Sequence, residues 1–175
     1  MHLGILAMEA GDFDEATRHF RRVLGLAARF QLKPSVPRGA RLYLAGIALK
    51  LGDRHGAEQA FQALAANPFP VEEKYRQAEF LMLEGDYHLL TGDYPTAEAR
   101  YRAALEAMAA IRMDESAGAG TALNKLAVLH RRRGEPEAAS KLHARALAMV
   151  KDWPRYKGTV LHDWAITLME AGDLT

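Results

Sequence analysis

A glycine followed by an acidic residue recurs five times at intervals of about forty residues, and this recurrence constrains the fold more than any other feature of the chain. The glycine-to-glycine spacings are 41, 40, 42 and 38 residues, and the dipeptides are Gly11-Asp12, Gly52-Asp53, Gly92-Asp93, Gly134-Glu135 and Gly172-Asp173. Self-similarity at a fixed period of this length is typical of arrays in which one supersecondary unit is repeated. We therefore expect five copies of one unit.

The residues around each glycine repeat as well. Seven residues before it stands glycine or alanine in all five copies: Gly4, Ala45, Gly85, Ala127 and Ala165. Five residues after the glycine stands an alanine in four copies: Ala16, Ala57, Ala97 and Ala139. Nine residues after it stands a ring: Phe20, Phe61, Tyr101 and His143. Twelve residues after it stands a small or medium apolar residue: Val23, Leu64, Ala104 and Ala146. Steps of three, four or seven residues place these positions on one face of an α-helix. Each glycine is therefore expected to join two antiparallel helices. The two helices approach closely at the small residues, and the ring fills the space beside them.

The turn chemistry and the composition agree with this interpretation. Glycine adopts the left-handed backbone with which many helices end, and an acidic residue after it suits the start of the next helix. Apolar residues make up 49% of the chain, charged residues make up 26%, and Ala, Leu, Arg and Glu dominate over β-branched residues. We expect an all-α protein with helices over 2–9, 14–30, 38–51, 55–66, 71–90, 95–113, 116–132, 136–150 and 156–170.

The combined pattern of a small residue, a turn glycine, an alanine and a ring resembles the tetratricopeptide repeat, from His2 to Asp173. The usual period of that family is about 34 residues, so the chain resembles a variant with a longer period. The resemblance implies a right-handed α-solenoid of stacked antiparallel helix pairs. We expect a single array over 1–175, with pairs at about 1–33, 38–67, 71–113 and 116–151 and an incomplete pair at 156–175. Because both ends interrupt a pair, we expect a piece of a longer protein whose uncapped ends allow self-association.

The resemblance also implies a partner site, because the first helices of the pairs line a concave groove in this family. By helical projection, the groove positions lie ten, six and three residues before each glycine. With three flanking positions, they give the candidate partner-binding residues: Ile5, Met8, Leu42, Tyr43, Leu49, Met82, Leu83, Asp86, Leu89, Asn124, Lys125, Val128, Arg131, His162 and Ile166. The first three rows are apolar and rich in methionine, which suits an amphipathic helix or an apolar peptide. The alternative is that these residues pack against other helices of the same protein.

Other kinds of site find less support in the sequence. A clamp for acidic tails would draw only on Asn124, Lys125 and Arg131, and the run from Arg131 to Arg133 suits a solvated helix C-terminus. His130 and His143 fall at neighbouring core positions, but no pair of histidines has the spacing of a metal-binding helix. No catalytic constellation or cofactor motif occurs. A net charge of +1 gives no field that would recruit nucleic acid or a membrane.

These observations predict a non-catalytic protein-interaction scaffold. Its partner, a protein or peptide, would place a peptide, a helix or a neighbouring domain in the groove. The alternative is a regulatory or sensor segment of a larger bacterial signalling or transcription-regulatory protein, which rests on analogy with other arrays of this period. The chain has no cysteine and no signal-peptide pattern, so we expect the cytoplasm. No cofactor is expected.

Overall fold

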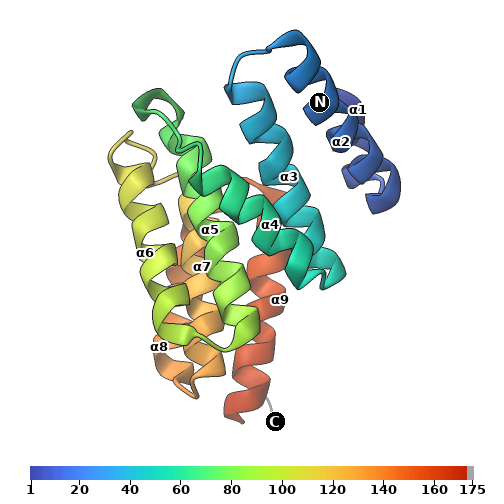
Figure 1. The fold of residues 1–175 in the computed structure, drawn as a ribbon. Coiled ribbons are helices and arrows are strands. Elements are labelled where there is room, and N and C mark those ends of the chain that lie inside the picture. The colour runs from blue at the N-terminus through green and yellow to red at the C-terminus, as the bar shows by residue number, and fades with distance from the viewer. Residues whose placement is uncertain (173–175) are drawn as a thin grey trace. The chain divides into compact units, whose positions relative to one another are not determined.

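The computed structural model describes residues 1–172, and within that range it contains only helices (Figure 1). The nine α-helices and one 3₁₀-helix are α1 (His2–Glu9), α2 (Phe13–Phe30), α3 (Ser35–Leu51), α4 (Arg54–Ala65), η1 (Val71–Glu73), α5 (Lys74–Thr91), α6 (Tyr94–Ala109), α7 (Ala117–Arg132), α8 (Pro136–Met149) and α9 (Pro154–Ala171). The expectation of an all-α fold is confirmed.

Each helix pair turns at one of the repeated glycines. All five adopt a left-handed backbone with φ between 72° and 82°, which costs glycine little. The acidic residue after the glycine caps the next helix in three copies: the carboxylates of Asp12, Asp53 and Asp93 accept the backbone N–H three residues later, at 2.9, 2.9 and 3.2 Å. Glu135 makes no such cap. Asp173, the acid of the fifth copy, lies outside the described residues.

Three helix boundaries differ from the sequence-based expectation by three or four residues. α5 begins at Lys74 rather than at residue 71, because residues 71–73 form the 3₁₀-helix η1. α3 begins at Ser35 rather than at residue 38, because Pro37 occupies its first turn, where a missing N–H costs little. α6 ends at Ala109 rather than at residue 113. Arg112 has a left-handed backbone with φ of 56°, and the N–H of Met113 closes the turn on the carbonyl of Met108 at 2.9 Å.

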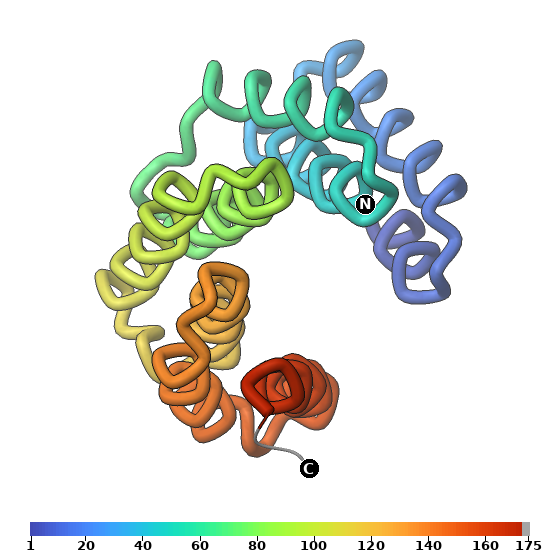
Figure 2. Tube along the Cα trace, turned by 90° about the horizontal axis from the view of Figure 1, so that it is seen from below, coloured from blue at the N-terminus to red at the C-terminus, as the bar shows by residue number. Residues whose placement is uncertain are grey.

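The described chain divides into two compact units, Met1–Pro70 and Val71–Thr175, of which the second is described to residue 172. In the first unit, α2 packs against both α1 and α3, and α3 packs against α4. In the second unit, α5 to α9 pack in serial order, and α7 also contacts α5 and α9. Within this second unit, α5, α7 and α9 lie along one side and α6 and α8 along the other (Figure 2).

The core is built from the repeated small residues and rings. The alanines five residues after the turns, Ala16, Ala57, Ala97 and Ala139, are fully buried, and the four rings are at most 8% exposed. A Cβ on Gly4 would lie 2.8 Å from the Phe20 ring, so the small residue is required by the close approach of the ring. The equivalent Ala165 on α9 is exposed, since residues 1–172 contain no helix after α9.

Candidate functional site

The candidate residues of the first unit lie on α1 and α3, where most of them take part in helix packing. Ile5, Met8 and Tyr43 pack against the core cluster around Phe20. The Tyr43 ring stacks on the Phe20 ring, with centroids 4.8 Å apart and planes 10° apart. Leu42 is only 4% exposed, and Leu49, the fifth candidate of this unit, is half-buried. Most of the predicted groove residues of the first unit therefore pack between α1, α2 and α3 and hold these helices together.

In the second unit, polar candidates bond across neighbouring first helices at a constant sequence separation of 39 residues. Lys125 on α7 donates to Asp86 on α5 at 2.6 Å. Asn124 on α7 donates to Asp163 on α9 at 2.6 Å, and Arg131 on α7 donates to Glu170 on α9 at 2.7 Å. Because 39 residues is close to the 38 to 42 residues between successive turn glycines, these bonds join the first helices of successive pairs. Lys125 and Arg131 are therefore already neutralised within the chain, which argues against a clamp for acidic tails.

Asp86 has a second partner inside the unit. The Tyr101 hydroxyl on α6 donates to its carboxylate at 2.8 Å, and Lys125 approaches both carboxylate oxygens. Burial, and then the charge of Asp86, raise the pKa of Tyr101 far above its ordinary value. Tyr101 thus stays a neutral donor that links the ring position of α6 to the charged pair.

A buried polar network joins α7, α8 and α9 around His143. The Nδ1 atom of His143 lies 2.9 Å from Asn124 Oδ1, and its Nε2 atom lies 3.0 Å from the Thr167 hydroxyl. His143 and Thr167 are fully buried. A neutral imidazole with its proton on Nδ1 fits this geometry: Nδ1 donates to Asn124 Oδ1, and Asn124 donates to Asp163. The single proton of the Thr167 hydroxyl has two acceptors within reach, Nε2 of His143 and the Asp163 carbonyl oxygen, each 3.0 Å away, and it is donated to one of them at a time. Burial lowers the pKa of His143 to about 4; Asp163 opposes this shift and Arg131 adds to it.

The remaining candidates of the second unit are apolar or weakly polar. Met82 and Leu89 on α5 pack against the core clusters around Met108 and Tyr101. Leu83 on α5, Val128 on α7 and Ile166 on α9 are half-buried, and His162 on α9 is exposed. We call Leu83, Val128 and Ile166 the apolar strip. These three residues and His162 neither belong to a described core cluster nor form a described bond.

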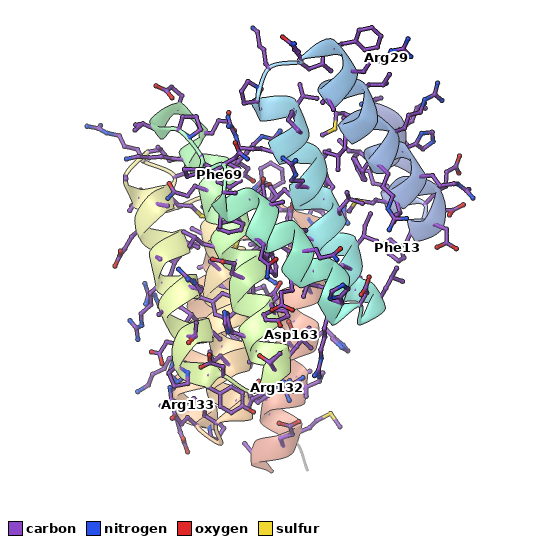
Figure 3. All side chains as sticks on the ribbon, viewed as in Figure 1. Phe13, Arg29, Phe69, Arg132, Arg133 and Asp163 are labelled. Carbon is purple, nitrogen blue, oxygen red and sulfur yellow. The ribbon has the colours of Figure 1, made fainter. Side chains whose placement is uncertain are left out.

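The other polar residues singled out in the sequence have structural partners. His130 lies 2.5 Å from Glu135, away from the partners of His143, so the two histidines serve different contacts. Arg133 bonds to Glu98 at 2.8 Å and to Glu135 at 3.0 Å at the end of α7 (Figure 3). Residues 1–172 contain no group of three or more potential metal ligands. None of the described helices combines the length and the apolar character that crossing a membrane requires.

Sequence reasoning missed the residues that complete these contacts, namely Asp163, Thr167 and Glu170 on α9. Asp163 and Glu170 each stand 39 residues after their partners on α7, one residue more than the 38 residues between Gly134 and Gly172. Adding the glycine spacing to Asn124 and Arg131 leads to His162 and Met169, so the period alone does not find these two pairs. The projection of single helices treats each face alone and cannot show such pairs.

The glycine turns, the small-residue and ring packing and the serial stacking define a helical-repeat protein of the scaffold class. Tetratricopeptide repeat family models match residues 2–69, 42–108 and 76–152. The chain therefore belongs to the tetratricopeptide repeat family, whose members are in general protein-interaction scaffolds.

Solved structures agree on the fold. BtubC (BKLC) from P. vanneervenii superposes with a TM-score of 0.74 at 22% sequence identity, over 98% of this chain and 71% of that protein. MamA superposes with a TM-score of 0.56 at 14% identity, over 99% of this chain and 96% of that one. At these identities the likeness concerns the solenoid fold of stacked helix pairs alone. No curated protein sequence matches the chain.

Proposed function

We propose that this chain is a non-catalytic scaffold that binds a peptide, a helix or a neighbouring domain on the first-helix face of its pairs, with the apolar strip as the main contact in the second unit. The observation that carries the proposal is the set of bonds between first helices. Three bonds of 2.6 to 2.7 Å fix α5, α7 and α9 against one another and consume the charges of Lys125 and Arg131. What these bonds leave available on that face is apolar.

Such a surface suits a partner with an apolar face. Leu83, Val128 and Ile166 keep part of their area exposed on three successive first helices, and Met169 on α9 is 67% exposed. Each leucine-sized side chain that a partner covers contributes about 1–3 kcal/mol, so a few anchors account for micromolar binding. Because the two groove cations Lys125 and Arg131 are paired, binding is expected to depend weakly on salt.

The test replaces residues of the apolar strip and leaves the bonded residues intact. Proteins captured by the wild-type chain from a cell extract are identified, and the purified partner is then titrated by calorimetry against Leu83→Gln and Val128→Gln variants. We expect each substitution to weaken binding about tenfold without lowering helicity. Leu90→Gln is the matched control, because Leu90 is 48% exposed at the end of α5 and is not a groove position. The proposal would be contradicted if the wild type and the three variants bound the partner with equal affinity.

A further inference from the structure

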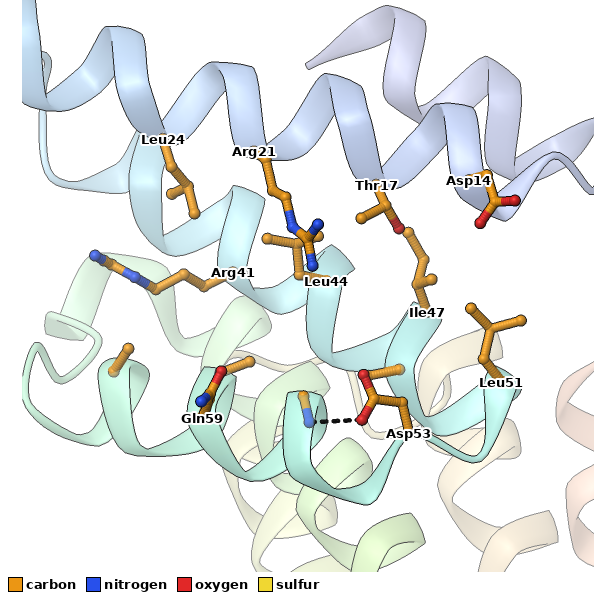
Figure 4. A pocket seen from close by; sticks show the side chains of 14 residues that line it. Asp14, Thr17, Arg21, Leu24, Arg41, Leu44, Ile47, Leu51, Asp53 and Gln59 are labelled. Atoms are coloured by element: carbon orange, nitrogen blue, oxygen red, sulfur yellow. Dashed lines mark hydrogen bonds between the residues drawn. The ribbon is translucent and has the colours of Figure 1, made fainter.

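A cleft in the first unit lies on the face of α3 opposite to the predicted groove. It has a volume of about 430 Å³ and lies between α2 and α4, which do not pack against each other, with α3 as its floor. Arg21 comes from α2, Arg41, Leu44 and Ile47 come from α3, and Ala60 comes from α4 (Figure 4). This volume is within the usual range for ligand sites and is large enough for a few side chains of a partner.

Two arginines of this cleft carry charges that nothing in the described chain neutralises. Arg21 is exposed and Arg41 is half-buried, and neither forms an ion pair or a hydrogen bond with any of residues 1–172. By contrast, Lys125, Arg131 and Arg133 in the second unit all have carboxylate partners. A half-buried guanidinium gains most from a bidentate carboxylate partner.

At the positions of the second unit that correspond to Thr17 and Arg21, the arginine has a carboxylate partner on its own helix. Counted from the turn glycines, Thr17 and Arg21 on α2 correspond to Glu98 and Arg102 on α6. Glu98 accepts hydrogen bonds from Arg102 at 2.7 and 3.1 Å, so the second unit supplies internally the carboxylate that Thr17 cannot. The internal comparison therefore identifies a carboxylate as the missing partner of Arg21.

The same count applies to α4 and α8. Ala60 on α4 corresponds to Leu142 on α8, and Leu142 packs against the core clusters that contain Leu126, Leu129 and Val150. The alanine leaves open the volume that the leucine fills. In the first unit the cleft thus lacks one leucine-sized apolar side chain and one carboxylate, and both are present at the equivalent place in the second unit.

The acidic residues of the cleft do not cancel this deficit. Asp14 lies seven residues before Arg21, which is about 10 Å along an α-helix. Asp53 accepts the N–H of Gly56 at 2.9 Å and caps α4 (Figure 4). Both carboxylates lie at helix N-termini. Asp14 is at one end of the cleft, Arg41 extends toward the other end, and Arg21 points into the space between them (Figure 4).

We infer that the cleft between α2 and α4 binds a peptide segment of a partner protein that places a leucine-sized apolar side chain beside Ala60 and a carboxylate on Arg21. The peptide supplies to the first unit what Leu142 and Glu98 supply to the second. The site is on the other face of α3 from the groove residues and in a different unit from the apolar strip, so either site can fail without the other.

The test uses short labelled peptides as probes and the whole chain as the receptor. The set contains six-residue peptides with one leucine and one glutamate separated by one to four positions in a glycine and serine background. Each has two matched peptides, in which glutamine replaces the glutamate or alanine replaces the leucine. Binding is measured by fluorescence polarisation, and the site is located by shifts of backbone amide signals in ¹⁵N-labelled protein.

We expect at least one leucine–glutamate spacing to shift signals of α2, α3 and α4, and both matched peptides to bind about tenfold more weakly. Arg21→Gln should weaken binding to the same extent, and Arg22→Gln, an exposed neighbour on α2, should leave it unchanged. Ala60→Leu and Thr17→Glu copy the second unit and should abolish binding. If one of them does not fold, as judged by thermal unfolding, the other decides. The inference is overturned if no peptide shifts these signals up to about 1 mM, or if binding survives Ala60→Leu or Thr17→Glu in the folded variant.

Discussion

The buried imidazole of His143 makes the stability of the second unit depend on pH. Its pKa is about 4 in the folded chain against an ordinary 6.5, so between these values the unfolded chain binds a proton that the folded chain does not. The free energy of unfolding therefore rises with pH over this interval. Stability from this group is complete above pH 6.5, is lost as the pH falls towards 4, and is constant below it.

The size of the effect follows from the same two pKa values. Their difference corresponds to about 3 kcal/mol of unfolding free energy. The charged groups that face His143 are Asp163 on α9 and Arg131 on α7, and their opposite effects on its pKa make burial the main cause. His143→Phe, which places at this position the ring found in the first two repeats, should remove this part of the pH dependence. At pH 8 it should also cost about 1–3 kcal/mol, because Asn124 and Thr167 lose a buried partner.

The chain offers a convenient probe for this measurement. Its two tryptophans, Trp153 and Trp164, are both in the second unit, and the Trp164 ring lies 6.3 Å from the His143 ring. Urea unfolding followed by tryptophan fluorescence at pH values from 8 to 4 therefore reports on this unit. We expect the unfolding free energy of the wild type to fall by about 3 kcal/mol more than that of the variant over this range. Parallel curves for the two proteins would refute the assignment of a buried neutral imidazole.

Two further predictions concern packing and charge in the second unit. Gly85→Ala places a Cβ into the Tyr101 ring and should lower the unfolding free energy by about 1–3 kcal/mol. Gly158→Ala on α9, where a Cβ would meet no atom within 4 Å, should raise it by about 0.5–1 kcal/mol. Thermal unfolding of the two variants checks this, and equal effects would contradict the close approach. A double-mutant cycle with Asp86→Asn and Lys125→Gln should give a coupling of about 1 kcal/mol in the free energy of unfolding. The value is modest because these side chains are 23% and 28% exposed, so solvent screens part of their attraction. Additive effects of the two substitutions would show that the pair contributes nothing.

Much of the fold was predictable because turn chemistry is local. A glycine in the left-handed region, an aspartate cap and a small residue beside a ring each act over a few residues, so Gly52, Asp53 and Ala57 could be assigned from the sequence. The boundaries that moved, at Ser35 and Ala109, depend on proline and left-handed residues whose exact place within a turn the hydrophobic pattern does not show.

The candidate site was less predictable because its chemistry depends on neighbouring helices. Helical projection grouped Tyr43 with the groove residues, but it gives the direction of a side chain and not what that side chain contacts. Tyr43 stacks on Phe20 of the adjacent helix, and Arg131 reaches Glu170 one repeat later. The same limit applies to the cleft beside Ala60. The sequence shows alanine where the second unit has leucine, but only the separation of α2 and α4 shows that the missing side chain leaves space.

Hydrogen exchange of the chain, free and bound to its captured partner, tests the scaffold proposal most directly, because it locates the partner without assuming the site. The account predicts slower exchange in α5, α7 and α9 around Leu83, Val128 and Ile166, with α6 and α8 unchanged. Protection confined to α6 and α8, or equal protection of first and second helices in that unit, would contradict binding on the first-helix face.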